Sequence, residues 1–290
     1  MDKYPQVLVG KRNAVLHLVW REAGVASFEK FVASYRKYKA GCDHQLLIAF
    51  KGFENKQDTL DNYLSILAGL DCKTIHVPNE GKDIFAYGHV VSRILGPCKA
   101  ILFLNSSTEI LCVNWLLHFQ NALQKVSVGV VGATGSWERR SPSDDWPNKH
   151  LRTNAFYGEL ELLRKLEWGN GDGGLLFEAG STSLYAQVTR LGLDVVVVGR
   201  DGVAYSNENW KDAGTFRSFG QHNLIIADNR TRDYQVGDTL KRTWFHTLAW
   251  HEYDPGPNPD KRGHFSYVVK RLIYTMKSLV KSPSSTKKDL

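Results

Sequence analysis

Residues 99–116 read K-A-I-L-F-L-N-S-S-T-E-I-L-C-V-N-W-L, and this stretch decides the fold class. An apolar strand ends at Asn105, a polar turn runs to Glu109, and a helix that carries Trp115 follows. Polar groups at the end of a buried strand lie at the carboxyl edge of an α/β sheet, where such folds bind their ligands. The stretch therefore predicts an α/β protein with a binding site at this turn.

Strand-like and helix-like segments alternate outward from the turn, which predicts repeated β–α units. Such units form a mostly parallel sheet with helices on both faces. Residues 136–152 are a long polar segment, which we expect to form a mobile loop over one edge of the sheet. The expected strands are residues 14–20, 45–50, 73–77, 126–131 and 194–198, and the expected helices are about residues 27–38 (after a Ser27 N-cap), 59–70, 84–95, 115–123, 159–166 and 182–191.

A proline-rich run at residues 255–259 marks the end of the main domain. We expect one domain over residues 1–255. Residues 256–290 are expected to form a basic amphipathic helix and a disordered tail. The bases of this helix suit an anionic membrane surface, and its apolar face equally suits packing on the domain, so both interpretations remain open.

The net charge of +7 and the isoelectric point near 9.1 indicate an anionic partner. A phosphate-bearing substrate and an acidic membrane surface both fit, whereas nucleic acid is not expected because zinc-finger, RNP-like and basic recognition-helix motifs are absent. No signal peptide or membrane-spanning run is found, so a cytoplasmic location is expected. The cysteines form no C-x-x-C pair, which predicts reduced, mostly structural thiols at Cys42, Cys72, Cys98 and Cys112.

Sequence motifs of several other enzyme classes are absent. Residues 132–135 read G-A-T-G and are similar to the start of a dinucleotide-binding loop. That loop needs a third glycine and a helix directly after it, and here a polar, proline-containing segment follows. NAD binding is therefore excluded. The G-x-S-x-G, H-E-x-x-H and Walker motifs are also missing.

Three segments occur in a characteristic order: H-V-P-N-E-G-K-D at residues 76–83, the turn at residues 105–109 with Trp115 after it, and V-G-V-V-G-A-T-G-S-W at residues 128–137. With them the chain resembles the family-two glycosyltransferases of GT-A fold, particularly those that build surface polysaccharide or lipopolysaccharide. The resemblance covers residues 15–198. It implies a Rossmann-like donor half at about residues 10–135 and an acceptor half at residues 136–255.

The resemblance also assigns donor-binding residues. Asn79 and Gly81 match an Asn-x-Gly segment, after which Lys82 and helix amides would suit a diphosphate and Asp83 a ribose or sugar hydroxyl. A capped turn with a solvated lysine and aspartate explains the same residues. The remaining donor-binding residues are those of the strand-end turn, Asn105, Ser106 and Ser107.

The expected metal ligand is altered. In the resembled family an aspartate at the strand end helps to hold a divalent cation on the donor diphosphate. Ser107 stands at that position, so the D-x-D motif is degenerate and Glu109 is the remaining candidate ligand. Whether the protein uses Mg²⁺ or Mn²⁺ is left open.

Glu178 is the candidate general base. An inverting transferase needs a carboxylate to take the proton from the acceptor hydroxyl, and in the resembled family it comes from an acidic pair before a helix. Glu178 precedes the helix expected from about Thr182, although Ala179 replaces the second acid. Asp172 is the fallback, and a glutamate that merely precedes a helix is the alternative interpretation.

Acceptor contacts are expected from the second half. Arg152 and Asn154 lie in a segment similar to one beneath the acceptor site of the family. Trp137 and Trp210 have polar sequence neighbours, so their rings are candidates to stack on sugars, with packing in the core as the more frequent alternative for any single tryptophan.

These expectations combine into one function. The chain is expected to be an inverting hexosyl- or deoxyhexosyltransferase of surface polysaccharide biosynthesis, which transfers a sugar from a nucleotide-sugar donor to a glycan or lipid-linked acceptor. It would work in the cytoplasm or at the inner face of the plasma membrane. The alternative, favoured by Ser107 and Ala179, is a non-catalytic nucleotide-sugar or glycan-binding protein on the same fold.

Overall fold

The structure, a computed structural model, describes residues 4–54, 56–139, 145–169 and 174–252. The expected C-terminal helix and tail lie outside the described residues. Asp172 does so as well.

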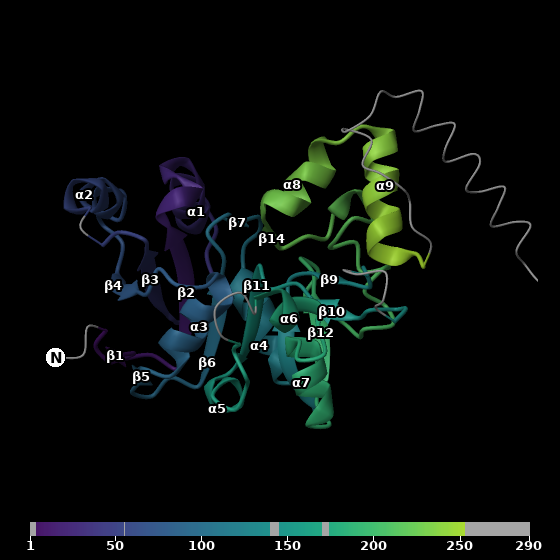
Figure 1. The fold of residues 1–290 in the computed structure, drawn as a ribbon, viewed down its shortest axis with the longest axis horizontal. Coiled ribbons are helices and arrows are strands. Elements are labelled where there is room, and N and C mark those ends of the chain that lie inside the picture. Colours follow the sequence, from purple (N-terminus) through teal and green to yellow (C-terminus); the bar gives the residue numbers. More distant parts are fainter. Residues whose placement is uncertain (1–3, 55, 140–144, 170–173, 253–290) are drawn as a thin grey trace, which may run out of the picture.

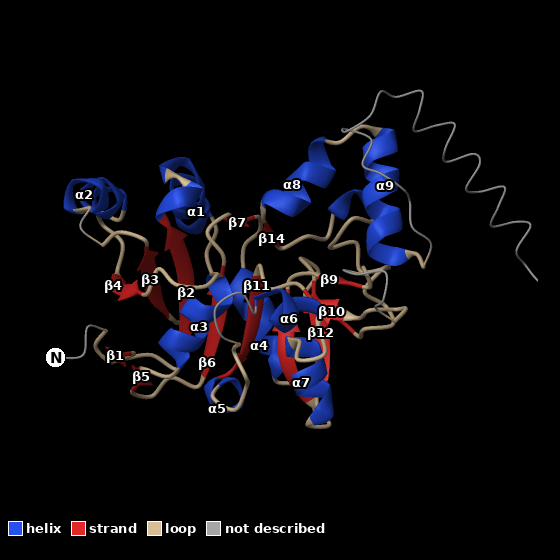
Figure 2. Ribbon diagram, viewed as in Figure 1, coloured by secondary structure: helices blue, strands red, loops and turns tan. Residues whose placement is uncertain are grey.

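A single large sheet forms the centre of the molecule (Figure 2). Its eight strands stand in the order β13-β12-β8-β11-β6-β2-β3-β4. From one edge to the other they are β13 (Ala204–Tyr205), β12 (Asp194–Val198), β8 (Val128–Gly132), β11 (Ala155–Glu159), β6 (Ala100–Leu104), β2 (Asn13–Trp20), β3 (Gln45–Lys51) and β4 (Cys72–Val77).

The strand directions confirm the mostly parallel sheet that the sequence predicts. Strands β4, β3, β2 and β6 run parallel to one another, and β12 runs parallel to β8. The strand β11 was not predicted. It lies antiparallel between β6 and β8, where Tyr157 stands opposite Leu102 on one side and Val131 on the other. A short edge strand, β13, is also antiparallel.

Helices cover both faces of the sheet, because successive side chains of the buried strands point to opposite faces and both sets are apolar. One face packs against Phe28, Tyr63 and Phe119 of three helices, and the other against Tyr87, Phe177 and Val188 of the opposite layer. The first layer consists of α1 (Val25–Lys37), α2 (Gln57–Ile66) and α4 (Trp115–Leu123), and the second of α3 (Asp83–Val91), α5 (Leu160–Leu163), α6 (Gly174–Ala179) and α7 (Leu184–Arg190).

The last described helices, α8 (Asn229–Val236) and α9 (Thr239–Trp250), lie beyond the end of the sheet (Figure 1). A short antiparallel pair, β7 (Glu109–Ile110) with β14 (Ile226–Ala227), joins the start of α8 to the turn after β6. Two other pairs are β1 (Val7–Leu8) with β5 (Ile94–Leu95) and β9 (Gly135–Ser136) with β10 (His150–Leu151). The pairing of β7 with β14 brings residues far apart in the sequence to the carboxyl edge of the sheet.

One local prediction was wrong: the first helix begins at Val25, after Gly24 at a φ of 81°, and not after Ser27. The segment at residues 136–152 is paired at its ends, where Ser136 lies opposite His150 in β9 and β10, and its described residues 137–139 and 145–149 form no helix or strand. Its Trp137 packs against Trp250 at a ring distance of 5.5 Å.

The cysteines of the chain are free thiols, with Cys98 buried and Cys42, Cys72 and Cys112 half-buried. Burial raises the pKa of the Cys98 thiol to about 11, so it remains protonated at neutral pH. Among the described residues, no helix combines the length and the apolar character that crossing a membrane requires.

His17 is a polar side chain in the middle of the core. It is fully buried in β2, its ring stacks on Phe31 at 3.6 Å, and neither ring nitrogen has a hydrogen-bond partner among the described residues. Burial lowers the pKa of His17 to about 3. In the folded protein, His17 therefore stays neutral down to about pH 3. In the unfolded chain the same histidine binds a proton below its ordinary pKa of about 6.5.

This burial predicts that acid weakens the fold through His17. Since the folded pKa is depressed, stability is lost as the pH falls from about 6.5 toward 3. The linkage amounts to about 2 kcal/mol between pH 7.5 and pH 5. In His17→Phe this part of the loss should vanish, as measured by urea unfolding at both pH values. The control is His76→Phe, because His76 is exposed and its replacement should leave the acid-induced loss of stability as in the wild type. Equal losses in His17→Phe and the wild type would show that His17 is not responsible.

Candidate functional site

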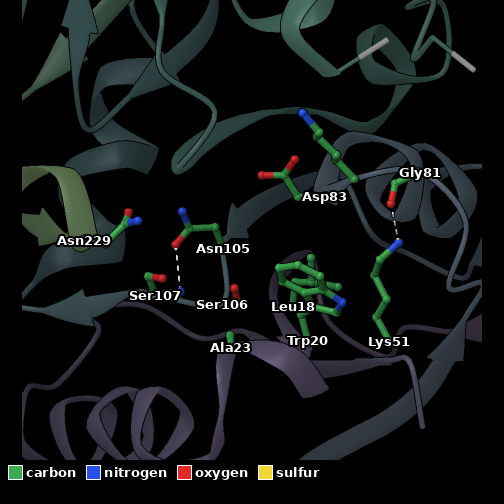
Figure 3. A pocket seen from close by; sticks show the side chains of 11 residues that line it. Leu18, Trp20, Ala23, Lys51, Gly81, Asp83, Asn105, Ser106, Ser107 and Asn229 are labelled. Atoms are coloured by element: carbon green, nitrogen blue, oxygen red, sulfur yellow. Dashed lines mark hydrogen bonds between the residues drawn. The ribbon is translucent and has the colours of Figure 1, made fainter. Parts of the chain in front are cut away.

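A cavity of about 450 Å³ opens at the carboxyl ends of β2, β3 and β6 (Figure 3). It gathers the predicted donor-binding residues except Asn79, whose exposed side chain lies against Gly52. The cavity is lined by Leu18, Trp20, Ala23, Lys51, Gly81, Lys82, Asp83, Asn105, Ser106, Ser107 and Asn229.

The turn after β6 is held in shape by the side chain of Asn105. Its Oδ1 accepts hydrogen bonds from the amide of Ser107 at 3.1 Å and from the hydroxyl of Thr108 at 3.2 Å. This is the local hydrogen bonding that favours asparagine in turns. In Figure 3 the amide nitrogen of Asn105 points away from these bonds. The turn thus presents an amide donor beside the hydroxyls of Ser106 and Ser107.

Lys51 at the end of β3 fixes the opposite wall. Its side chain is 3% exposed, and its Nζ donates to the carbonyl oxygens of Glu80 at 2.6 Å, Gly81 at 2.8 Å and Pro78 at 3.4 Å. Burial lowers the pKa of Lys51, while the charges of Asp83, Glu54 and Glu80 oppose that shift. An ammonium group has three N–H donors, and these three carbonyl oxygens accept all of them. Lys51 positions the segment before α3 and leaves the exposed Lys82 as a cation available to a ligand.

Asp83 begins α3 and accepts a hydrogen bond from the amide of Ile84 at 3.0 Å. Burial and the negative charge of Glu178 raise the pKa of Asp83 to about 6. A carboxyl group that titrates near neutral pH in a cavity is a common feature of functional sites.

Glu178 precedes α7, close to where the sequence predicts a helix, and it lies in the last turn of α6, which was not predicted. Glu178 does not line the cavity, but its charge acts on both Asp83 and Arg152. The charge of Glu178 therefore links the cavity electrostatically to a second polar cluster.

That second cluster, the Arg152 cluster, consists of Glu138, Arg152, Arg217 and Asp228. Arg152 pairs with Asp228 at 3.1 Å, and Arg217 pairs with Glu138 at 3.1 Å. Both guanidinium groups stack on Phe216. Burial alone would raise the pKa of Asp228, but Arg152 and the amide of Thr231 hold it below its usual value. Burial lowers the pKa of Arg217 to about 10, against the opposing charge of Glu138.

The predicted acceptor-binding residues lie in different parts of the structure, outside the cavity. Arg152 is in the Arg152 cluster, and the nearby Asn154 is buried with its Oδ1 bound by the hydroxyl of Thr134 at 2.7 Å. Trp137 is half-buried and donates its indole N–H to the carbonyl of Asn207 at 3.2 Å. None of them lines the cavity.

The prediction for Trp210 was wrong. Its side chain is 0% exposed, because the ring lies over Gly135 and against Tyr185, and its indole N–H is bound by the carbonyl of Tyr205 at 3.2 Å. Polar sequence neighbours gave no sign of this burial. Trp210 is a core residue and offers no face to a sugar.

The site residues fit a divalent cation poorly. Among the described residues that line the cavity, Asp83 is the one carboxylate. Glu109, the other candidate ligand, pairs with Arg232 at 3.4 Å, and the same guanidinium donates to the carbonyl of Ser107 at 3.0 Å. The described residues contain no group of three or more histidine, cysteine, aspartate or glutamate side chains that could hold a metal.

Several lining residues were not predicted. Trp20, 39% exposed, ends β2, and Lys51 ends β3, so the carboxyl-edge argument that singled out Asn105 applies to them as well. Asn229 reaches the cavity from the start of α8. No local signal in the sequence indicates that placement, since it follows from the pairing of β7 with β14.

No protein-family model matches the chain, and no curated protein matches it in sequence. Among solved structures it is similar to the galactosyltransferase LgtC in complex with donor and acceptor sugar analogues, with a TM-score of 0.46, 11% identity and coverage of 93% of this chain and 98% of that one. It is also similar to a mannosyltransferase from Pyrobaculum calidifontis in complex with GDP-mannose and Mn²⁺, with a TM-score of 0.44 and 12% identity. There it covers 76% of this chain and 66% of the mannosyltransferase, slightly less than two thirds.

A third similar structure is 4-diphosphocytidyl-2C-methyl-D-erythritol synthase from Anaerococcus prevotii. The TM-score is 0.42, the identity is 14%, and the match covers 67% of this chain and 92% of that one. Because all these TM-scores lie below 0.5, we base no conclusion on the likenesses.

Proposed function

We propose that this protein is a glycosyltransferase of the GT-A type that uses a nucleotide-sugar donor. The observation that carries the proposal is the cavity itself. It places an exposed aromatic ring, an exposed lysine beside a helix start, and a turn rich in amide and hydroxyl groups at the carboxyl edge of one sheet. A nucleoside diphosphate has the matching parts, namely a flat base, two phosphates and sugar hydroxyls.

In the proposed complex the nucleobase stacks on Trp20, with Leu18 and Ala23 as its apolar surroundings. Lys82 and the amides at the start of α3 bind the diphosphate. The carboxylate of Asp83 accepts hydrogen bonds from hydroxyls of the donor, and the side-chain amide of Asn105 donates hydrogen bonds to them. Figure 3 shows Asn105 and Asn229 at one end of the cavity and Lys51 at the other, with Leu18 and Trp20 between them.

The proposed reaction is an inverting transfer with Glu178 as general base. An acceptor hydroxyl attacks the anomeric carbon of the donor sugar, its proton passes to the carboxylate, and the nucleoside diphosphate leaves. The charge of Glu178, which acts on both Asp83 and Arg152, supports this role. Arg152, Asn154 and Trp137 stay the sequence-based candidates for acceptor recognition, although Asn154 is buried and none of the three lines the cavity. A glycan or lipid-linked acceptor, a role in surface polysaccharide synthesis and a cytoplasmic or membrane-surface location stay predictions from the sequence.

The proposal is tested by incubating the full chain with UDP-, GDP-, ADP- and dTDP-sugars and measuring released nucleoside diphosphate and glycosylated product. One donor is expected to be turned over. Trp20→Ala should weaken binding of that donor by about 5- to 150-fold, the usual range for losing a base-stacking ring. Trp244→Ala in α9 is the matched control and should bind as the wild type does. Equal binding by wild type and Trp20→Ala would contradict this placement of the base.

The alternative function is a non-catalytic nucleotide-sugar-binding protein, favoured by the single carboxylate among the lining residues and by Ala179 beside Glu178. Donor binding without turnover on any acceptor, and without donor hydrolysis, would support it over the enzyme.

A further inference from the structure

The carboxylates around the cavity are already committed to other partners. Asp228 is 1% exposed, pairs with Arg152 and caps α8 by accepting the amide of Thr231 at 2.8 Å. Glu109 faces the guanidinium of Arg232. A magnesium or manganese ion on a diphosphate needs carboxylate oxygens that are free to turn toward it. Asp83 is the one carboxylate among the described residues that line the cavity, and it accepts a hydrogen bond from the amide of Ile84, the second residue of α3.

Positive charge stands where such an ion would be needed. The guanidinium of Arg232, which also pairs with Glu109, donates to the carbonyl of Ser107 at 3.0 Å behind the turn. Lys82 lines the cavity at the start of α3. The amino ends of α3 and α8 both reach the cavity, through Asp83 and Asn229, and each helix start carries a partial positive charge. The charge of Asp228 at the start of α8 is offset by Arg152.

We infer that the donor diphosphate binds in this cavity without a divalent cation, its charge being met by Lys82, by the starts of α3 and α8, and by Arg232 behind Ser107. This inference rests on the proposed function, since it concerns the same donor site. Ser107 is then a functional part of the site and not a damaged metal ligand. A serine hydroxyl can donate a hydrogen bond to a phosphate oxygen, whereas an aspartate at this position would repel it unless a cation lay between them.

The first test is calorimetric titration of the full chain with UDP, GDP, ADP and dTDP, in EDTA and in millimolar Mn²⁺ or Mg²⁺. The preferred nucleotide is expected to bind with Kd values within about threefold of each other in both conditions. Binding that requires the cation, or tightens more than about tenfold with it, would overturn the inference and leave the proposed function standing. Failure of every nucleotide in both conditions would overturn the two together.

The second test creates a metal ligand. In Ser107→Asp, affinity in EDTA should fall at least tenfold because of repulsion, and Mn²⁺ should restore most of it. Ser107→Asn, which is neutral and of similar size to aspartate, should show no such response to Mn²⁺. If Ser107→Asp binds as the wild type does in both conditions, the diphosphate does not lie at this turn and the inference fails.

Arg232 is tested with its partner removed as well, so that misfolding is not mistaken for lost binding. The double variant Arg232→Met with Glu109→Gln leaves no unpaired charge at this position. It is expected to lose about tenfold in cation-free affinity with an unchanged unfolding midpoint. Glu109→Gln alone should bind the nucleotide at least as well as the wild type. Wild-type affinity in the double variant would overturn the role of Arg232.

Discussion

Glu178→Gln is expected to lower turnover of the preferred nucleotide sugar by about 10²- to 10⁴-fold, the usual contribution of a positioned general base. Glutamine keeps the size and polarity of the side chain but cannot take a proton. Glu178 does not line the cavity, so the Kd for the nucleoside diphosphate should change little. Initial rates at saturating donor, together with calorimetric Kd values, separate these two effects.

Glu161→Gln is the matched control, because Glu161 lies in the first turn of α5, the preceding helix, and its side chain is 78% exposed. Its turnover should equal that of the wild type. Full activity in Glu178→Gln combined with loss of activity in Asp83→Asn would contradict the assignment. It would move the role of base to Asp83, whose pKa of about 6 also suits proton transfer near neutral pH.

Asp228→Asn is expected to destabilise the fold by about 3–5 kcal/mol, the typical cost of removing one partner of a buried ion pair. Asparagine keeps an oxygen that can accept the amide of Thr231, so the cap of α8 is preserved. Arg152, however, is left in the protein interior without its counter-charge. Urea unfolding at neutral pH measures the difference.

The control for the cap is Asp238→Asn. Asp238 caps α9 by accepting the amide of Lys241 at 2.9 Å, and no ion pair of Asp238 is found within the described residues. This variant should lose no more than about 0.5 kcal/mol. If the two substitutions cost the same, the Arg152–Asp228 pair contributes nothing beyond a cap. Adding Arg152→Met to Asp228→Asn should recover much of the loss, since no buried charge then lacks a partner.

Much of the first half of the chain was predictable from the sequence for a physical reason. Strands such as β2, β3 and β6 are buried on both faces and therefore read as continuous apolar runs. The turn at Asn105 follows such a run, which places it at the ligand-binding edge by topology alone. Residues Gly81, Lys82 and Asp83 meet that turn in the cavity because their own strand, β4, ends at the same edge.

The second half was less predictable because its structure depends on contacts between distant residues. The run A-F-Y-G-E of β11 is short and contains a glycine, and its central position comes from pairing with β6 and β8. Likewise, α8 reaches the cavity only because Ile226 pairs with Ile110. The burial of Trp210 follows from the absence of a side chain on Gly135, which the sequence around Trp210 does not reveal.

The antiparallel strand β11 restricts how this molecule can move. It is hydrogen-bonded along one side to β6 and along the other to β8, so the backbone ladder runs without interruption across the sheet. Any movement that separates β6 from β8 would have to break that ladder. Helix α8 lies outside the sheet and is joined to the cavity through the short β7–β14 pair, so a displacement of α8 would leave the ladder intact.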